Sequence, residues 1–326
     1  MVESLGPVVL KSGEPVSATA VRGPDAAWRG RITALLGHKG EPWLWQNSEL
    51  LSRAAGIDAW FYVLHRDGQP FAHQMTAELQ GVGIFGHVWT EPADRGQGAA
   101  SELMRLQMAH FRRRNGRALY LSTRFASTPY RLYQKHGFVG LDPLSGYMTW
   151  TAAPLADFEA DYFAPGATAI EALGWPHWPT APALFMSATP GLVRCAPLKL
   201  FGRKSSEGAL LPWIQGRSLR NEPDQVFTLV KPNGAVVGLA AWTQDEFSPD
   251  TLCVDVFCQA AFWSQGEALL RQALKSAPAR KCIAYADSLC PPKAAVLTRL
   301  GFALVTAWPR RLAGDAENLL MFERRG

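Results

Sequence analysis

Apolar and polar positions divide the first half of the chain into a regular series of predicted elements. Two segments carry apolar residues at mixed spacings of three and four, which is typical of helices. Alternating segments separated by turn residues follow and predict an antiparallel meander. A longer helical pattern then places Leu103, Met104, Met108 and Phe111 on one face. In chain order we expect helices at 24–39 and 43–55, strands at 59–65, 71–79 and 84–90, a helix at 98–114, a strand at 117–123, a short helix at 129–136, and strands near 138–141 and 147–151.

The second half repeats this order. The tripeptide Pro232-Asn233-Gly234 separates two apolar runs, which is a strong hairpin signal. The segments YRLYQKHGFVG and AVLTRLGFALV both place Gly-Phe directly after a short helix, and an internal duplication explains the match. We therefore predict domains at 1–152 and 169–326, joined by a Pro-, Gly- and Ala-rich linker at 153–168. The expected elements are a strand at 169–173, helical or irregular material to about 220, strands at 225–230, 235–242 and 251–257, a helix at 262–275, a strand at 281–286, a short helix at 292–300, and strands at 302–305 and 319–323.

Composition supports two soluble domains. The chain has 326 residues, of which 48% are hydrophobic, so each half can bury a core and intrinsic disorder is not expected. No apolar run approaches the length of about 18 to 20 residues that spans a bilayer, and the start lacks the pattern of a secretory signal. All five cysteines lie in the second half without CxxC spacing, which argues against a zinc site or a disulfide framework. We expect a cytoplasmic protein with no metal and no membrane partner.

The positive charge of the chain changes this picture little. The formal net charge is +5, which weakly favours an anionic partner. Its densest cluster, Arg112-Arg113-Arg114, precedes Asn115-Gly116 and fits the C-terminus of a helix, where cations complement the dipole. No recognition-helix or RNP-like motif is present, so a nucleic-acid partner is not expected, although a basic nucleic-acid-associated protein stays as a third hypothesis.

The candidate chemistry begins between the third strand and the long helix, in the segment EPADRGQGAA at 91–100. Gly96 and Gly98 allow a ligand to approach the backbone closely. The unpaired amides at the start of the helix face outward at the positive end of its dipole. Such a turn can cradle a phosphate or pyrophosphate, and Arg95 can add charge-assisted hydrogen bonds. The structural alternative is an ordinary strand-to-helix turn with two permissive glycines.

Tyr133 supplies the second feature. It lies on the short helix at 129–136, which Ser127 or Thr128 can cap and Gly137 can end. A tyrosine on a short helix before Gly-Phe, downstream of a strand, RGxG, a helix and a strand, resembles the GNAT superfamily of acyl-CoA N-acyltransferases. The resemblance covers about residues 15–152 and, more faintly, 165–325. It implies an α/β (α+β) fold of two tandem GNAT-like domains, each a mixed, mostly antiparallel sheet flanked by helices.

The resemblance also implies a substrate and a site. Acetyl-CoA or another acyl-CoA is the implied donor, with its pyrophosphate on the amides of residues 95–100 and its pantetheine arm beside the strand that ends at 88–90. Tyr133 would then lie near the thioester sulfur. The implied cofactor-binding residues are Val88, Trp89, Thr90, Arg95, Gly96, Gln97, Gly98, Ala99, Ala100, Ser122 and Ser127.

The reaction requires a hydrogen-bond donor for the thioester oxygen, an acid for the leaving group and a base for the amine. Negative charge develops on the thioester oxygen, and the amide of Trp89 or Thr90 can stabilise it. A tyrosine is a weaker acid than a thiol, so Tyr133 is expected first as a hydrogen-bond donor to the departing sulfur and second as a general acid. His87 is the first candidate for the base, Glu91 the second and a water chain the third. A packing role remains the alternative for Tyr133, and a structural role remains the alternative for His87.

Two departures from the family pattern qualify the resemblance. Many relatives carry Asn seven residues before the tyrosine, where this chain has Ala126, so Ser127 is the candidate replacement. In the second half, Leu297 occupies the tyrosine position, and Phe262 occupies the position of Gly98. Because two large aromatic side chains, Phe262 and Trp263, are incompatible with a phosphate cradle, the second half resembles a degenerate GNAT domain.

We therefore predict an N-acetyltransferase that acts on a small-molecule amine. Trp28, Trp43, Trp45 and Glu41 lie in the region that borders the acceptor in this superfamily, and they suggest a partly apolar acceptor, although the tryptophans can equally close the core. A protein lysine acetyltransferase and a non-catalytic CoA-responsive binding protein remain the alternatives. We expect either a monomer with an internal pseudo-dimer or a homodimer.

Overall fold

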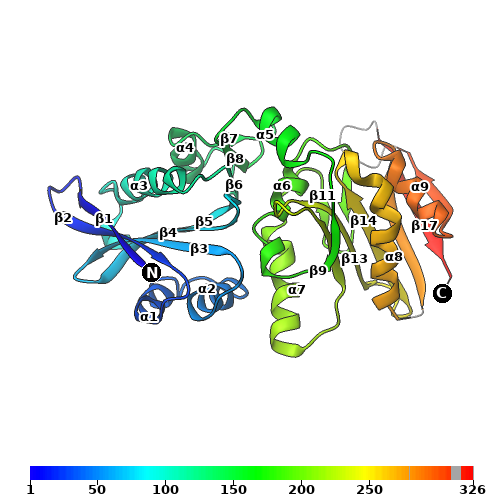
Figure 1. Cartoon of the computed structure of the whole chain (residues 1–326), viewed down its shortest axis with the longest axis horizontal. Coiled ribbons are helices and arrows are strands. Elements are labelled where there is room, and N and C mark those ends of the chain that lie inside the picture. Colours follow the sequence, from blue (N-terminus) through cyan, green and yellow to red (C-terminus); the bar gives the residue numbers. More distant parts are fainter. Residues whose placement is uncertain (279, 310–316, 326) are drawn as a thin grey trace. The chain divides into compact units, whose positions relative to one another are not determined.

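The computed structural model describes residues 1–278, 280–309 and 317–325. The chain divides into two compact units, Met1–Phe158 and Glu159–Gly326, which we describe separately. Both contain a large, mostly antiparallel sheet flanked by helices (Figure 1). The predicted fold class is therefore confirmed.

Unit 1, which we define as Met1–Phe158, has an eight-stranded sheet with the order β1-β2-β3-β4-β5-β6-β8-β7. Its single parallel pair among the described strands is β5 with β6. The elements of this unit are β1 (Val2–Val9), β2 (Pro15–Arg22), α1 (Ala26–Leu35), α2 (Trp43–Ser52), β3 (Asp58–Arg66), β4 (Gln69–Leu79), β5 (Val82–Thr90), the 3-10 turn η1 (Pro92–Asp94), α3 (Ala99–Arg113), β6 (Ala118–Ser122), α4 (Thr128–Lys135), β7 (Val139–Gly140) and β8 (Tyr147–Thr151).

Helices cover both faces of this sheet (Figure 1). Consecutive residues of β4 show the division, because neighbouring side chains of a strand point to opposite faces. Met75 contacts Gln46 of α2 through its sulfur at 3.6 Å, whereas the amide of Gln74 donates to the carbonyl of Ala100 on α3 at 2.7 Å. Helix α4 lies on the α3 side, where Tyr130 and Tyr133 join Phe85 in one buried cluster.

Strands β5 and β6 separate partway along their length. Their register runs from Val82 opposite Ala118 to Ile84 opposite Tyr120, although β5 continues to Thr90 and β6 to Ser122. Beyond Ile84, strand β5 stays paired with β4 only among the described residues. The sheet is therefore open between the ends of β5 and β6, next to the start of α3.

Unit 2, Glu159–Gly326, follows the same strand order from the other edge, namely β9-β12-β13-β14-β15-β17-β16. Here β14 and β15 form the parallel pair, and they also separate after three paired positions, which end at Cys253 opposite Ile283. The elements are β9 (Ala169–Ala172), the 3-10 turn η2 (Trp175–His177), α6 (Ala181–Met186), β10 (Val193–Cys195), β11 (Leu200–Phe201), α7 (Glu207–Arg220), β12 (Val226–Val230), β13 (Val236–Gln244), β14 (Thr251–Cys258), the 3-10 turn η3 (Ala260–Gln265), α8 (Gly266–Ser276), β15 (Lys281–Asp287), α9 (Pro291–Arg299), β16 (Ala303–Trp308) and β17 (Leu319–Arg324).

The structure corrects three of the predicted elements. It also places a helix, α5 (Leu155–Tyr162), within the segment at 153–168 that we predicted as a linker. The helix expected at 262–275 begins as the 3-10 turn η3, and its α-helical part starts at Gly266. Helices α1 and α2 end at Leu35 and Ser52, earlier than the apolar pattern suggested.

Two strands at the start of the chain were not predicted. Gly6 and Pro7 interrupt the strand pattern of β1, and they are tolerated because β1 is an edge strand and Gly6, with a φ of +90°, lies at a bulge in its pairing with β2. No helix among the described residues has the length and apolarity needed to cross a bilayer.

Candidate active site

The turn between β5 and α3 exposes a row of backbone donors. Gly96 and Gly98 adopt left-handed conformations, with φ of +79° and +83°, which a residue with a side chain adopts only under strain. Gly98 is the N-cap of α3, and its carbonyl accepts the amides of Ser101 and Glu102. None of the hydrogen bonds between described residues uses the amides of residues 96–100. Five consecutive amides therefore have no hydrogen-bond partner among the described residues at the positive end of a fifteen-residue helix.

Side chains on both flanks hold this turn in place. The Arg95 Nε donates to the carbonyl of Thr90 at 3.0 Å, and its guanidinium lies over the ring of Trp89. Asp94 pairs with Arg66 at 2.7 Å, and Arg66 also binds Glu14 through two hydrogen bonds. Since η1 is tied in this way to β3 and, through Arg66, to the loop between β1 and β2, the turn is held in place by the protein itself.

Lys11 is a residue of this site that the sequence did not reveal. It lies in the hairpin between β1 and β2, where its amide donates to the carbonyl of Gln97 at 3.1 Å. A Cβ atom placed on Gly98 would lie 3.7 Å from the Cγ and Cε atoms of Lys11. The contact joins residues almost ninety positions apart, so only the packing of the hairpin against α3 brings this ammonium to the turn.

A bulge in β5 sets the direction of the next side chains. The register with β4 shifts between His73 opposite Trp89 and Met75 opposite Gly86, and His87 has a φ of +54°. Val88 consequently packs against the cluster that contains Phe85 and Tyr133. His87 and Trp89 turn to the other face, where they meet Trp43 and His38 at ring-centroid distances of 5.4 and 3.6 Å. His38 is thus a second residue of the site that the sequence analysis missed.

The two histidines beside the bulge are uncharged. His73 Nδ1 donates to the carbonyl of His87 at 2.9 Å, and burial lowers the pKa of His73 to about 4. Burial also lowers the pKa of His87 well below its usual value, and the nearby His73, Lys39 and His38 lower it further. The Nε2 atoms of both rings are buried and make no hydrogen bond to a described residue. His87 therefore presents a neutral ring, but its basicity is weakened.

Tyr133 lies at the opposite side of the opening, on α4. Its ring is 7% exposed and meets Phe85 edge to face at 5.3 Å. The Tyr133 hydroxyl makes no hydrogen bond among the described residues, and burial alone raises its pKa to about 12. Tyr133 is therefore a neutral hydroxyl with a free donor.

The remaining candidates lie at the edges of the opening. Ser122 is exposed at the end of β6. The Ser127 hydroxyl accepts the amide of Tyr130 at 3.2 Å, so it caps α4. Ala126, which stands where many GNAT proteins carry Asn, has a φ of +55°, a conformation that Asn adopts readily. Glu91 follows β5 directly, and its backbone amide donates to the carbonyl of Phe71.

The corresponding opening in unit 2 holds a segment of the chain itself. The Asp287 carboxylate at the end of β15 accepts the amides of Leu192 and Val193 at 2.8 and 2.7 Å. On β14, Asp255 accepts the amide of Ala196 at 2.8 Å and pairs with Lys293, which is fully buried. Both carboxylates lie beyond the point where β14 and β15 separate. The segment at 192–196 is therefore bound to both strands of this opening.

The described residues contain no cluster of three or more His, Cys, Asp or Glu side chains suited to a metal ion.

Comparison with known proteins gives a family for the central part of unit 1. Residues 58–140, which run from β3 to β7, match the family model of the acetyltransferase (GNAT) domain. This segment contains the glycine turn, the bulge in β5 and Tyr133. A search of curated proteins finds no match.

Solved structures with a similar fold are distant in sequence. An N-acetyltransferase from Staphylococcus aureus Mu50 is 14% identical, with 49% of this chain and 99% of that chain covered and a TM-score of 0.38. An acetyltransferase of the GNAT family from Streptococcus pneumoniae is also 14% identical, with 48% and 99% covered and a TM-score of 0.37. The PaiA N-acetyltransferase from Thermoplasma acidophilum, in complex with coenzyme A, is 11% identical, with 40% and 98% covered and a TM-score of 0.31. The assignment therefore relies on the family model. The chain carries a GNAT acetyltransferase domain at residues 58–140.

Proposed function

We propose that this protein is an acyl-CoA-dependent N-acetyltransferase and that unit 1 binds the donor. The observation that carries the proposal is the row of five unpaired amides at 96–100, which two left-handed glycines present at a helix N-terminus. Backbone amides in this arrangement bind phosphate groups, and the helix dipole favours negative charge there. The pyrophosphate of acetyl-CoA fits this chemistry. The side chains of Arg95 and Lys11 add positive charge on either side.

From this turn, the pantetheine arm would enter the opening between β5 and β6. Val88, Trp89 and Thr90 line one strand of it and Ser122 ends the other. Ser127 at the start of α4 can still donate its hydroxyl proton to the arm. The backbone of β5 beyond Ile84 has no partner on β6 among the described residues, so its amides can pair with the amide groups of pantetheine and polarise the thioester carbonyl.

The reaction joins the acceptor nitrogen to the acyl carbon and breaks the carbon–sulfur bond. The amine attacks the carbonyl, the oxygen gains negative charge, and the electron pair of the broken bond leaves with sulfur. Tyr133 assists by donating a hydrogen bond to the departing thiolate. Because its pKa is about 12, complete proton transfer to a thiolate is uphill, and the thiolate takes its proton from solvent.

The acceptor amine loses one proton in this reaction. His87 lies on the bulge near the carbonyl-binding backbone, and its neutral ring can accept a hydrogen bond from the amine. Its lowered pKa makes it a weak base, so Glu91, one step beyond the end of β5, remains the second candidate. Trp43, His38 and Trp89 give this face of β5 an aromatic character, which favours a small, partly apolar amine over a charged protein segment.

We further propose that residues 1–152 and 169–326 are an active and a degenerate GNAT-like domain. The common strand order supports an internal duplication. In unit 2 the segment at 192–196 already binds the two strands that would otherwise receive a pantetheine arm. Moreover, the segment that leads into α8 is the 3-10 turn η3, which contains Phe262 and Trp263, whereas the segment that leads into α3 contains Gly96 and Gly98. One acyl-CoA should therefore bind per chain.

Thermal stabilisation and calorimetry with acetyl-CoA test this proposal. A ligand at about 100 times its Kd stabilises the folded state by about 2.7 kcal/mol, which appears as a rise in Tm. We expect this rise and a stoichiometry of one in the parent chain, and loss of both in Gly98→Trp. Gly202→Trp, at an open left-handed glycine of unit 2, is the control. Absence of binding, or binding that survives Gly98→Trp, would refute the cradle.

Thiol release then identifies the acceptor. A panel of small aromatic and aliphatic amines is compared with lysine-containing peptides at equal concentration. We expect acetyl-CoA-dependent thiol release with a small amine. Release with peptides only would assign the protein to lysine acetylation, and binding without release would assign it to CoA-responsive regulation.

A further inference from the structure

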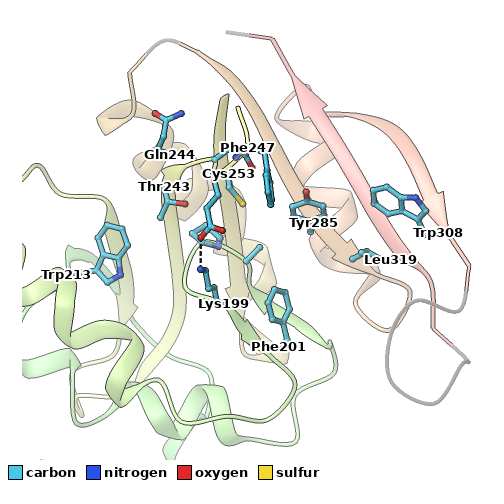
Figure 2. A pocket seen from close by; sticks show the side chains of 14 residues that line it. Lys199, Phe201, Trp213, Thr243, Gln244, Phe247, Cys253, Tyr285, Trp308 and Leu319 are labelled. Atoms are coloured by element: carbon cyan, nitrogen blue, oxygen red, sulfur yellow. Dashed lines mark hydrogen bonds and ion pairs between the residues drawn. The ribbon is translucent and has the colours of Figure 1, made fainter. Parts of the chain in front are cut away.

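Unit 2 contains a cavity that the proposed acetyl transfer does not use. Its volume is about 840 Å³, within the range of small-molecule sites. It lies on the face of the sheet that carries β10 and β11, and its lining residues Ala196, Cys253 and Tyr285 border the point where β14 and β15 separate. Figure 2 shows Trp213, Phe201, Phe247, Tyr285 and Trp308 around it. These aromatic side chains do not simply close a core, because two of them, Phe201 and Phe247, are exposed.

Phe247 gives the clearest sign that the cavity has an occupant. Its side chain is 94% exposed, although a large apolar group in water is unfavourable. Its backbone is nevertheless fixed, since the Asp245 carboxylate accepts the amides of Phe247 and Ser248 at 3.0 and 2.9 Å. The loop therefore fixes the backbone of an exposed aromatic residue at the mouth of the cavity, where a ligand can cover its ring.

The charges around the cavity favour a cation. Its lining contains two carboxylates, Asp245 and Glu246, and one ammonium, Lys199. The pKa of Cys253, which lines the cavity, is raised to about 12, first by burial, then by the charge of Asp255 and then by that of Asp245. The negative charge of Asp245 therefore acts toward the interior of the cavity. Cys253 is thus a neutral, apolar part of the floor and not a nucleophile.

The ion pair at the mouth is exchangeable. Lys199 Nζ lies 2.6 Å from the Glu246 carboxylate, and the two side chains are 74% and 65% exposed (Figure 2). Such exposed pairs contribute little stability, so a ligand ammonium can replace Lys199 as the partner of Glu246. Aromatic faces beside this position add cation–π attraction for the same group.

We propose that this cavity of unit 2 binds an arylalkylamine, with the aromatic ring between Phe201, Phe247 and Tyr285 and the ammonium at Glu246. The site is independent of the acyl-CoA site of unit 1, and its test does not require turnover. The ring of the ligand supplies the buried apolar area, and the carboxylates of Asp245 and Glu246 select its head group.

Calorimetry of the full chain with three probes tests the proposal. 2-Phenylethylamine, 2-phenylethanol and 3-phenylpropionate share a ring and differ in head-group charge. We expect the amine to bind most tightly and the carboxylate most weakly, with the emission of Trp213 changing on saturation. Equal or tighter binding of the carboxylate, or no saturable binding of any probe, would overturn the proposal.

Two variants locate the binding in this cavity. Glu246→Gln should weaken amine binding about three- to fivefold and leave alcohol binding unchanged. Phe201→Ala should weaken all three probes about three- to tenfold. The matched controls are Glu267→Gln, on α8, and Leu219→Ala, an exposed apolar residue of α7. Amine binding that persists unchanged in both cavity variants lies elsewhere, for instance at the acceptor site of unit 1, and would also overturn the proposal.

Discussion

Replacing Tyr133 by phenylalanine separates the two roles that the structure allows for this residue. The ring would keep its edge-to-face contact with Phe85 and its place in the buried cluster. The hydroxyl makes no hydrogen bond among the described residues, so its removal leaves no partner unsatisfied. The free energy of unfolding should therefore change little, whereas acetyl transfer should slow.

The size of the effect follows from the pKa of Tyr133. A value of about 12 lies roughly 3.5 units above that of a thiol near 8.5, so full proton transfer costs about 5 kcal/mol. Tyr133 is then a hydrogen-bond donor, and a hydrogen bond to a charged group contributes about 1.5 to 3 kcal/mol. Its loss predicts a decrease in kcat of about 10- to 150-fold. A decrease of several thousandfold would instead indicate general acid catalysis.

Thiol release at saturating acetyl-CoA measures this change. We expect kcat to fall while KM for acetyl-CoA stays nearly constant, because the hydroxyl acts on the departing sulfur. Tyr130→Phe is the matched control, since Tyr130 lies on the same helix and its hydroxyl packs above Gly140. An unchanged kcat in Tyr133→Phe, or an equal loss in Tyr130→Phe, would refute the assigned role.

Two further predictions concern buried charges. Burial lowers the pKa of His73 to about 4 in the folded state, whereas the unfolded state has the usual value near 6.5. Between these two values the unfolded state binds more protons, so the free energy of unfolding should fall as the pH is lowered. At about pH 5 the expected decrease is about 2 kcal/mol. Urea unfolding of His73→Asn, which keeps a donor for the carbonyl of His87, should show a weaker loss, and an unchanged pH dependence would contradict this. Lys293→Met leaves Asp255 buried without its ion-pair partner and should lower the free energy of unfolding by about 3 to 5 kcal/mol in denaturant titrations. A change below about 1 kcal/mol would show that this pair does not hold the segment at 192–196.

Local features of this protein could be predicted from the sequence. The helix at 98–114 is confirmed to within one residue at each end, because its apolar spacing and its glycine start are properties of a single segment. Gly96 and Gly98, which the sequence places before this helix, have left-handed backbone conformations, which glycine adopts with little strain. The helix that carries Tyr133 runs from Thr128 to Lys135, with Ser127 as its cap.

Other features depend on residues that are distant in the sequence. The bulge that places Val88, instead of His87, on the same face as Phe85 depends on the register between β4 and β5, and no local signal at His87 indicates it. Lys11 reaches Gly98 only because the first hairpin packs against α3. In unit 2, the binding of the segment at 192–196 to Asp255 and Asp287 could not be predicted from the sequence either.

The sequence by itself determined which segments form helices, strands and the glycine turn, because these depend on short-range periodicity and backbone freedom. Only the tertiary structure decided where strands part, which groups are buried and which charges meet, because burial and strand pairing are set by contacts between distant segments.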